Sequence, residues 1–257
     1  MKYGICPLSI VPVRREADDS SEMVTQMLFG EAFKIMRATK KWVHIQLAYD
    51  QYEGWIDKKQ VLELNQEQFK EISEGQPTIT TDLVDVVIKT NSNRMTPIVM
   101  GSTLPHFNQG ELLLADTSFK YEGAVTDGVL PKAHLVENAY MYLHAPYLWG
   151  GRSPFGIDCS GFTQMVYKMN GVRLRRDASQ QATQGEVLSF IEETQPGDLA
   201  FFDNNEGTIT HVGIILEDNH IIHASGQVRI DKLDQQGIFN RDLGTHTHKL
   251  RLIKKVI

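Results

Sequence analysis

The stretch Gly156-Ile157-Asp158-Cys159-Ser160-Gly161-Phe162 decides the fold of the second half of the chain, because it joins a turn directly to a helix. Asp158 is a good N-cap residue, and Gly171 lies where such a helix would end. Apolar residues follow the cysteine at the spacing of one buried helical stripe: Phe162, Met165, Val166 and Met169.

The cysteine in this stretch is a candidate nucleophile. We expect Cys159 at or next to the first helical position, where unpaired backbone N–H groups and the helix dipole favour a thiolate. A thiolate is the reactive form, so the stretch predicts a nucleophile on a rigid mounting. The alternative is a small buried hydrophobe, which a cysteine in a helix more often is.

Composition bounds the remaining possibilities. The chain has 257 residues, 41% hydrophobic and 23% charged, which is ordinary for a globular protein of two or three small domains. A net charge of -6 without a basic tract argues against a nucleic-acid partner.

No apolar run approaches the ~20 residues that cross a bilayer, so we expect no membrane partner. The first residues lack the apolar core of a signal peptide, which predicts a cytoplasmic protein unless the natural start lies upstream.

The two cysteines, Cys6 and Cys159, are predicted to be free thiols. A disulfide between them is the alternative, but so few cysteines without an export signal favour reduced side chains. Nothing in the sequence calls for a cofactor. His246 and His248 alternate like a metal pair but have no carboxylate or thiolate companions nearby, so we expect no metal site.

The N-terminal quarter of the chain is predicted to be a small barrel at residues 1–63, since short alternating strands and turns fill it. It resembles a bacterial SH3 domain (SH3b) in three segments: Phe29-Gly30-Glu31, Trp42-Val43-His44-Ile45 and Tyr52-Glu53-Gly54-Trp55-Ile56. Residues 64–80 are polar and predicted to connect. Residues 81–128 repeat the order weakly and predict a second, diverged SH3b-like barrel. The alternative is one larger β domain covering both.

Residues 129–257 are predicted to form an α+β domain, with helices first and an antiparallel sheet after them. We expect a helix at 134–143, then the helix that begins at Cys159. A strand at 199–202, a hairpin made of 211–216 and 220–224, and a final strand at 250–257 would form the sheet.

The predicted hairpin supplies a base for the thiol and a group to orient that base. If its loop is 217–219, Gly213 lies opposite His223, and His211 is a diagonal neighbour of His223 on the same face. His211 can then face Cys159 with His223 behind it, which is the order that nucleophilic catalysis needs. A loop longer or shorter by one residue would turn one histidine to the other face. Taken singly, each histidine is more often structural.

The order of these motifs resembles the NlpC/P60 family of cysteine peptidases, whose core is papain-like. The resemblance is carried by Pro146-Tyr147-Leu148-Trp149-Gly150-Gly151, the stretch around Cys159, Arg176-Asp177, Pro196-Gly197-Asp198-Leu199, His211-Val212-Gly213-Ile214 and Ile222-His223-Ala224. It implies Cys159 as nucleophile, His211 as base and later acid, and His223 as the residue that orients it. It also implies that substrate is contacted by Tyr147, Trp149, Asp158, Ser160 and Asp177. Some relatives have Ser where this chain has Ala178, which puts one polar contact in doubt.

The resemblance also implies a substrate. Family members with N-terminal SH3b domains and this layout resemble the γ-D-glutamyl-L-diamino-acid endopeptidases, which cut murein peptides after L-Ala-γ-D-Glu when the alanine amine is free. The SH3b domain binds that amine, and Glu22 and Tyr52 are the matching candidates here. The missing signal sequence fits recycling of imported wall peptides inside the cell. The sequence does not give the oligomeric state, and a monomer is favoured. The alternatives are an amidase or acyltransferase of the same fold, and a protein that only binds wall fragments.

Overall fold

The computed structural model describes residues 2–257, which form two compact units. Unit 1 runs to Val129 and also includes Arg152–Pro154. Unit 2 contains Leu130–Gly151 and Phe155–Ile257. The domain boundaries expected from the sequence, at 63, 80 and 128, stay predictions.

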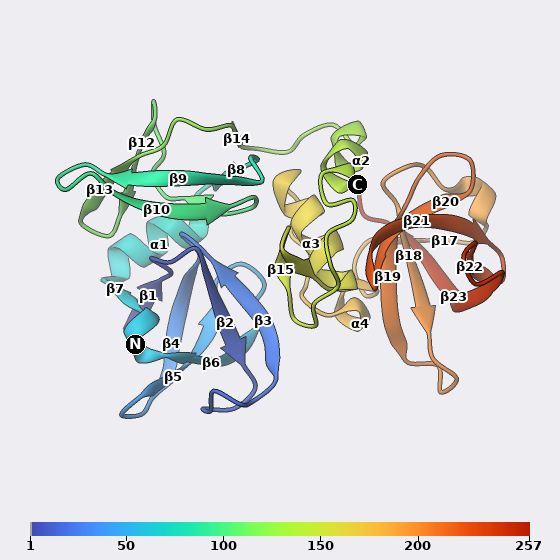
Figure 1. Ribbon diagram of the computed structural model, residues 1–257, viewed down its shortest axis with the longest axis horizontal. Coiled ribbons are helices and arrows are strands. Elements are labelled where there is room, and N and C mark those ends of the chain that lie inside the picture. The colour runs from blue at the N-terminus through green and yellow to red at the C-terminus, as the bar shows by residue number, and fades with distance from the viewer. Residues whose placement is uncertain (1) are drawn as a thin grey trace. The chain divides into compact units, whose positions relative to one another are not determined.

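Unit 1 begins with a seven-stranded antiparallel sheet in the order β3-β2-β6-β5-β4-β1-β7 (Figure 1). Apolar side chains alternate along these strands and meet in one core that contains Val11, Phe33 and Ile45. The free thiol of Cys6 is buried there and donates to the carbonyl of Leu8. The elements are β1 Lys2–Ile5, β2 Ile10–Arg14, β3 Met23–Leu28, β4 Ala32–Ala38, β5 Trp42–Leu47, β6 Glu53–Asp57, the 3-10 helix η1 Lys58–Gln60 and β7 Leu62–Leu64.

The segment at 64–80 does more than connect, because it contains the helix α1 (Gln66–Glu74). Asn65 and Gln68 cap this helix reciprocally, each side chain bonding the other's backbone N–H at 2.9 and 3.0 Å. Phe69 is buried and stacks on Tyr3 at a ring distance of 4.3 Å. The spacing Asn-x-x-Gln was therefore a helix signal within a stretch that we expected to be a polar connection.

Residues 78–126 form two smaller antiparallel sheets, ordered β10-β9-β13-β12 and β11-β8-β14. Their buried side chains, such as Val87 and Phe119, share one cluster with Ile5 of β1 and with Phe29, which directly follows β3. These strands therefore share their core with the first sheet. A second barrel at 81–128 stays a prediction. The strands are β8 Thr78–Thr80, β9 Val84–Lys89, β10 Arg94–Val99, β11 Thr103–Leu104, β12 Glu111–Leu114, β13 Thr117–Lys120 and β14 Val125–Thr126.

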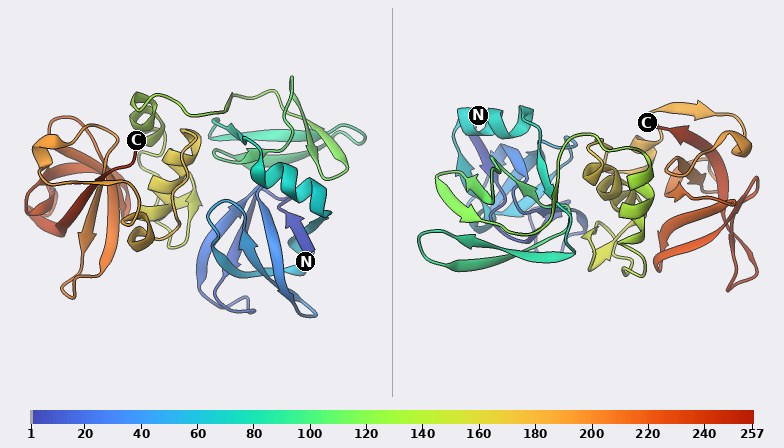
Figure 2. Two further views of the ribbon diagram at one scale, coloured as in Figure 1. Left: turned by 180° about the vertical axis from the view of Figure 1, so that it is seen from behind. Right: turned by 90° about the horizontal axis from the view of Figure 1, so that it is seen from above.

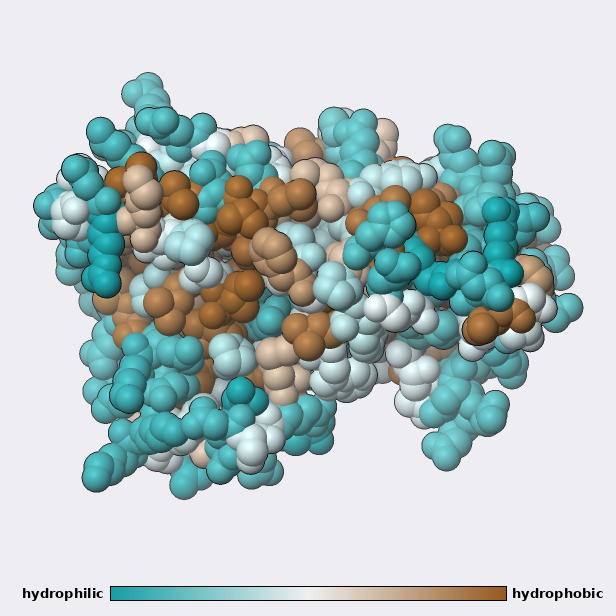
Figure 3. All heavy atoms as spheres, viewed as in Figure 1, coloured by the Kyte–Doolittle hydropathy of each residue, from teal (hydrophilic) through white to brown (hydrophobic). Residues whose placement is uncertain are grey.

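One face of unit 1 carries exposed apolar side chains. Figure 3 shows hydrophobic residues gathered over the region of β9 and β10. Val84 on β9 and Met95 on β10 are among the exposed large hydrophobic side chains. Single exposed apolar residues are common on protein surfaces, so they assign no role to this face by themselves.

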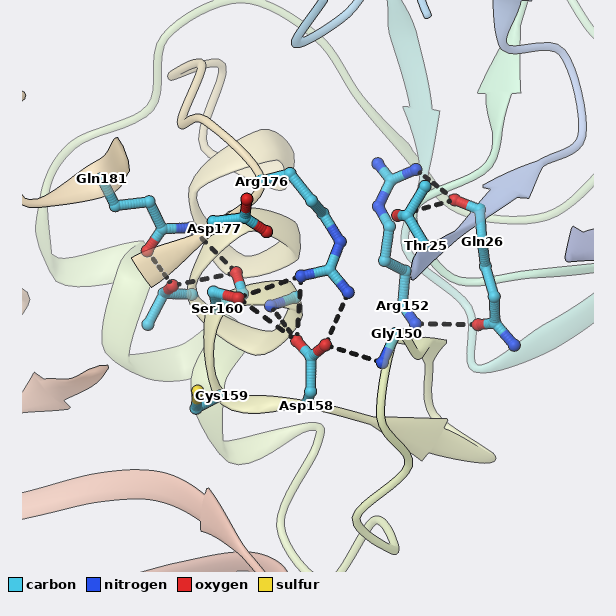
Figure 4. A network of polar contacts seen from close by, with 12 residues as sticks. Thr25, Gln26, Gly150, Arg152, Asp158, Cys159, Ser160, Arg176, Asp177 and Gln181 are labelled. Carbon is cyan, nitrogen blue, oxygen red and sulfur yellow. Dashed lines mark hydrogen bonds and ion pairs between the residues drawn. The ribbon is translucent and has the colours of Figure 1, made fainter. Parts of the chain in front are cut away.

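A buried arginine completes unit 1. Arg152, in the two-residue strand β15 (Arg152–Ser153), pairs with both carboxylate oxygens of Glu31 at 2.8 and 2.9 Å. Its backbone N–H donates to the side chain of Gln26, as Figure 4 shows, and its guanidinium donates to the Gln26 carbonyl. Both charges are almost completely buried, so each side chain compensates for the contact with water that the other's charge has lost.

Unit 2 is built on a seven-stranded sheet in the order β17-β23-β18-β19-β20-β21-β22. Because β22 also pairs with β23, the last six strands close on one another. The predicted final strand at 250–257 is longer and begins earlier, and two strands between 227 and 240 were not predicted. The strands are β16 Gly156–Ile157, β17 Glu186–Leu188, β18 Leu199–Asp203, β19 Ile209–Ile215, β20 His220–Ser225, β21 Gln227–Asp234, β22 Gly237–Asn240 and β23 Thr245–Lys255.

The helices α2, α3 and α4 of unit 2 lie together on one side of this sheet (Figures 1 and 2). The central helix α3 is fully buried and packs against β19 and β20. The helices are α2 Ala133–Tyr140, α3 Cys159–Met169, α4 Ala178–Gln181 and the 3-10 helix η2 Ile191–Glu193. An α+β arrangement with an antiparallel sheet is therefore confirmed for this unit. Across residues 2–257, none of the helices has the length and apolar character that a membrane span requires.

Candidate active site

The helix α3 begins at Cys159, as predicted, and Asp158 is its N-cap. The Asp158 carboxylate accepts the backbone N–H of Gly161 at 2.6 Å, which satisfies a donor in the first turn. The helix ends at Met169, and Gly171 follows with a φ of +74°, a conformation that glycine adopts without strain. The local sequence thus fixes both ends of the helix that carries the thiol.

The predicted activation of this thiol by the helix alone is wrong for the resting protein. Cys159 is only 7% exposed. Burial, followed by the negative charge of Asp158, raises the pKa of the thiol to about 12. The backbone N–H of Val212, the charge of Arg176 and the N–H of Ser160 lower the pKa but do not outweigh burial. The thiol is therefore protonated at neutral pH and needs a base.

Asp158 and Arg176 form a buried ion pair beside the nucleophile (Figure 4). The guanidinium donates to both carboxylate oxygens, at 3.0 and 2.6 Å, and Gly150 donates its N–H to the second oxygen at 2.8 Å. Asp158 was predicted to contact substrate. In the structure, its carboxylate accepts hydrogen bonds from protein donors. These bonds connect the N-terminus of α3 to Gly150 and Arg176.

Ser160 lies in the same network. Its hydroxyl accepts from Arg176 at 2.9 Å, and its carbonyl accepts from the side chain of Gln181 at 2.9 Å. Thr163 in turn donates to Gln181 at 2.7 Å. These contacts connect the first turn of α3 to α4. Arg176 and Gln181 had no predicted role, although Arg176 stands directly before Asp177 in a motif that carries the resemblance.

The two histidines meet as the hairpin register predicted. Gly213 pairs with His223, and the loop between β19 and β20 leaves His220 bonded to Leu216. The Nε2 of His211 lies 2.9 Å from the Nδ1 of His223, and both rings are buried. Gly213 is required here, because a Cβ at this position would lie 2.9 Å from the Cβ of His223.

The thiol of Cys159 contacts the backbone of β19 on both sides of His211. Its Sγ lies 3.9 Å from the carbonyl oxygen of Thr210, and the N–H of Val212 favours its thiolate form. The candidate nucleophile on α3 thus contacts the strand that carries the candidate base. Burial, followed by the nearby rings of His223 and His248, lowers the pKa of His211 well below its usual value, so His211 is neutral at rest.

The hydrogen bonds continue beyond His223 to two residues that the sequence did not reveal. The Nε2 of His223 lies 3.1 Å from Oδ2 of Asp231, on the unpredicted strand β21. Arg229 donates to both oxygens of Asp231, at 2.7 and 2.9 Å. The alternation of β21, in which Asp231 is an inward-facing polar residue, was the only signal that could have suggested them.

His248 is a third residue that the sequence analysis did not place. Its ring stacks on His211 with centroids 4.2 Å apart and meets Phe202 edge-on at 6.0 Å. His246 instead bonds to Asp234, at 2.9 Å to the nearer oxygen, so the two are not a metal pair. Within residues 2–257, no group of three or more His, Cys, Asp or Glu side chains is arranged to hold a metal ion.

Tyr147 and Trp149 lie in the segment that leads to Cys159, and Tyr147 forms a backbone bridge with Ile157. Tyr147 bonds its backbone N–H to Gly226 at 3.0 Å and is half-buried. Burial, followed by the charges of Cys159 and Asp158, raises the pKa of its phenol to about 12. Its hydroxyl is therefore a hydrogen-bond donor near the thiol. Trp149 is 60% exposed, and its contact with substrate stays a prediction.

The remaining predicted contacts are spread over both units. In unit 2, Asp177 precedes α4 and its carbonyl accepts the N–H groups of the helix's third and fourth residues. In unit 1, Glu22 precedes β3 and pairs with Arg15 at 2.8 Å. Tyr52 lies in the turn before β6 and packs against the barrel core. Their roles in substrate binding stay predictions.

A polar cavity of about 650 Å³ opens in unit 2 beside the histidines. Thr210, whose carbonyl contacts the thiol, and His248, which stacks on His211, are part of its wall. Most of the other residues that line it are polar: Asp203, Asn204, Asn205, Gln235, Gln236, His246, Thr247 and Lys249, with Phe202 and Leu250 as the apolar exceptions.

Comparison with known proteins assigns this arrangement. Residues 144–246 match the model of the NlpC/P60 family, and residues 13–61 match the model described as the bacterial dipeptidyl-peptidase SH3 domain. Dipeptidyl-peptidase 6 of Lysinibacillus sphaericus is 30% identical to the chain over 259 residues, which cover 90% of the chain and 92% of that relative. The chain belongs to the NlpC/P60 family. It is a peptidase, so the hypothesis of a protein that only binds wall fragments is set aside.

Other NlpC/P60 relatives agree over nearly the whole chain. Gamma-D-glutamyl-L-lysine dipeptidyl-peptidase of Bacillus cereus is 29% identical, covering 90% of this chain and 76% of its own. The crystal structure of an NlpC/P60 protein from Bacillus cereus shares the fold, with a TM-score of 0.83 at 20% identity over 99% of both chains. The predicted NlpC/P60 domain and one SH3 domain are confirmed.

Proposed function

We propose that this NlpC/P60 peptidase hydrolyses the bond between γ-D-Glu and the diamino acid of murein peptides whose N-terminal L-Ala is free. The observation that supports it best is the buried thiol of Cys159 against the backbone of β19, the strand that carries His211, whose ring is bonded to His223 on β20. Relatives that align with 90% of the chain are named gamma-D-glutamyl-L-lysine dipeptidyl-peptidase and dipeptidyl-peptidase 6, which supports this substrate class.

The catalytic cycle uses Cys159 as nucleophile and His211 as base and then acid. His211 takes the proton of Cys159 as Sγ attacks the γ-carbonyl carbon of D-Glu, and the carbonyl oxygen becomes an oxyanion. The backbone N–H of Cys159, at the N-terminus of α3, donates to that oxyanion. Protonated His211 then gives its proton to the departing amine of the diamino acid. The same histidine activates the water that hydrolyses the thioester.

The raised pKa of the thiol fits this order of events. A thiol with a pKa of about 12 keeps its proton in the empty site, so proton transfer to His211 accompanies attack on the substrate. Burial is the largest cause of the raised pKa, so it also keeps the resting nucleophile in its less reactive form.

The requirement for a free amine is assigned to the SH3 domain of unit 1. An ammonium group needs a carboxylate or an aromatic face, and Glu22 and Tyr52 supply these groups. Glu22 already pairs with Arg15 at 2.8 Å. We expect the Glu22 carboxylate to contact the substrate ammonium while it remains paired with Arg15. Glu22→Gln should therefore raise KM for free-amine peptides and leave kcat nearly unchanged.

The test compares L-Ala-γ-D-Glu-meso-diaminopimelate with its N-acetylated copy as substrates for the purified protein. The free peptide should release L-Ala-γ-D-Glu, and the acetylated peptide should remain intact. Equal cleavage of both would refute the free-amine requirement. Cys159→Ala should abolish cleavage, and activity that survives this change would refute the mechanism.

Two further predictions accompany the proposal. If the enzyme is instead an acyltransferase, an added amine acceptor will appear in the product in place of water.

A role in recycling wall peptides inside the cell stays a prediction, and so does a monomeric state. Cell fractionation would test its location, and sedimentation would test its oligomeric state.

A further inference from the structure

Three buried side chains form a line of hydrogen bonds that ends at the candidate base. Asp231 Oδ2 lies 3.1 Å from His223 Nε2, and His223 Nδ1 lies 2.9 Å from His211 Nε2. Asp231 and His223 are each about 1% exposed, so the bonds between these groups, and not bonds to water, set their protonation.

Asp231 is an ionised acceptor at neutral pH. Burial raises its pKa, but the hydrogen bonds from His223 and Arg229 outweigh burial and hold the pKa at about 2. Arg229 donates through Nε and Nη2 to the two oxygens of Asp231. The same Nη2 lies 2.8 Å from Asp242, an exposed carboxylate, which anchors the guanidinium from the other side.

An ionised carboxylate can only accept, so the nitrogen of His223 that faces Asp231 must carry hydrogen. A neutral imidazole has one N–H, which leaves Nδ1 of His223 as an acceptor. The nitrogen of His211 that faces it, Nε2, must then donate. His211 is also neutral at rest, so its Nδ1 holds the lone pair.

We propose that Asp231 is a positioning residue that fixes, through His223, the tautomer of His211 whose Nδ1 can accept the thiol proton. Without this carboxylate, His223 can instead carry its hydrogen on Nδ1 and donate to His211 Nε2. His211 would then hold its own hydrogen on Nδ1, and a protonated nitrogen cannot serve as a base. This inference rests on the roles proposed above for Cys159 and His211.

The carboxylate acts again when His211 is protonated. Imidazolium at His211 donates to His223, and His223 donates to Asp231, so the positive charge is spread toward a fixed negative group. Arg229 holds the plane of that carboxylate and keeps it ionised, so the proton stays on His211 and goes to the leaving amine.

The experiment reads the tautomers directly, by long-range ¹H–¹⁵N NMR of the full-length protein at neutral pH without substrate. In the wild type, both His211 and His223 should carry hydrogen on Nε2. Hydrogen on Nδ1 of His211 would overturn the proposal, and this result needs no variant that might misfold. Because no substrate is present, a failure of the proposed peptide specificity leaves this measurement intact.

Asp231→Val then removes the acceptor without adding another, and Val suits a strand. Asp242→Val is the matched control, because it removes the other carboxylate on Arg229 and leaves His223 untouched. In Asp231→Val, the Nδ1–H form of His211 should appear. The value of kcat should fall about 10- to 100-fold with KM unchanged, which is the usual cost of losing a hydrogen bond that orients a functional histidine. Asp242→Val should keep both the tautomer and kcat. An unchanged His211 tautomer in Asp231→Val would overturn the proposal.

Discussion

Arg176→Met should destabilise the catalytic unit and make the thiol less acidic. Arg176 is about 1% exposed and gives two hydrogen bonds to Asp158 and one to Ser160. The variant leaves the Asp158 charge buried, with the N–H groups of Gly150 and Gly161 as its remaining backbone donors. Breaking one side of a buried ion pair costs about 3–5 kcal/mol, and we expect a loss of unfolding free energy in this range.

The loss has a measurable thermal equivalent. For a unit of this size, 1 kcal/mol corresponds to roughly 4 °C, so the Tm of the catalytic unit should fall by roughly 10–20 °C. Calorimetry of the full-length protein measures the shift. Hydrogen exchange of peptides that cover α3 identifies the transition that moves. Removal of the Arg176 charge should also raise the pKa of the Cys159 thiol, which slows its alkylation by iodoacetamide at a fixed pH.

Arg175→Met is the matched control, because Arg175 is the neighbouring arginine and is exposed. It should change Tm by no more than about 2 °C, as expected for a surface substitution. The double variant Asp158→Asn with Arg176→Met should lose less than the two single variants together, since the pair is coupled. If Arg176→Met unfolds at the wild-type temperature, the ion pair does not hold α3 in place and the argument is refuted.

Three further variants test other parts of the structure. Gly213→Ala should lower kcat, because its Cβ would lie 2.9 Å from that of His223; steady-state kinetics with normal kcat would show that the strands adjust. Burial, followed by repulsion from His223 when both rings are protonated, lowers the pKa of His248 to about 4. About 3 kcal/mol of stability should therefore be lost as pH falls from 6.5 to 4, and urea unfolding of His248→Gln should show a smaller loss. Arg152→Met leaves Glu31 buried and should destabilise unit 1 by about 3–5 kcal/mol; hydrogen exchange that is unchanged on β3 and β4 would contradict this.

Local signals were sufficient where a few neighbouring residues decide the structure. Asp158 caps the helix that Cys159 begins, and both follow from a short stretch of sequence. The register that places Gly213 opposite His223 follows from a three-residue loop. The capping pair at Asn65 and Gln68 was equally local, but it was hidden within a polar segment that we expected to be a connection.

The sequence by itself determined the helix that begins at Cys159 and the register that brings the two histidines together, because capping, periodicity and hairpin register act over a few residues. Only the tertiary structure decided that Asp231 and His248 lie beside the histidines. His248 reaches them because β23 pairs with β18, a strand distant in the sequence, and Asp231 lies on β21, a strand that the sequence analysis did not predict. The tertiary structure also reversed the expected acidity of Cys159. The N-terminus of a helix favours a thiolate, but burial of the same sulfur raises its pKa to about 12, and burial depends on how the whole unit packs.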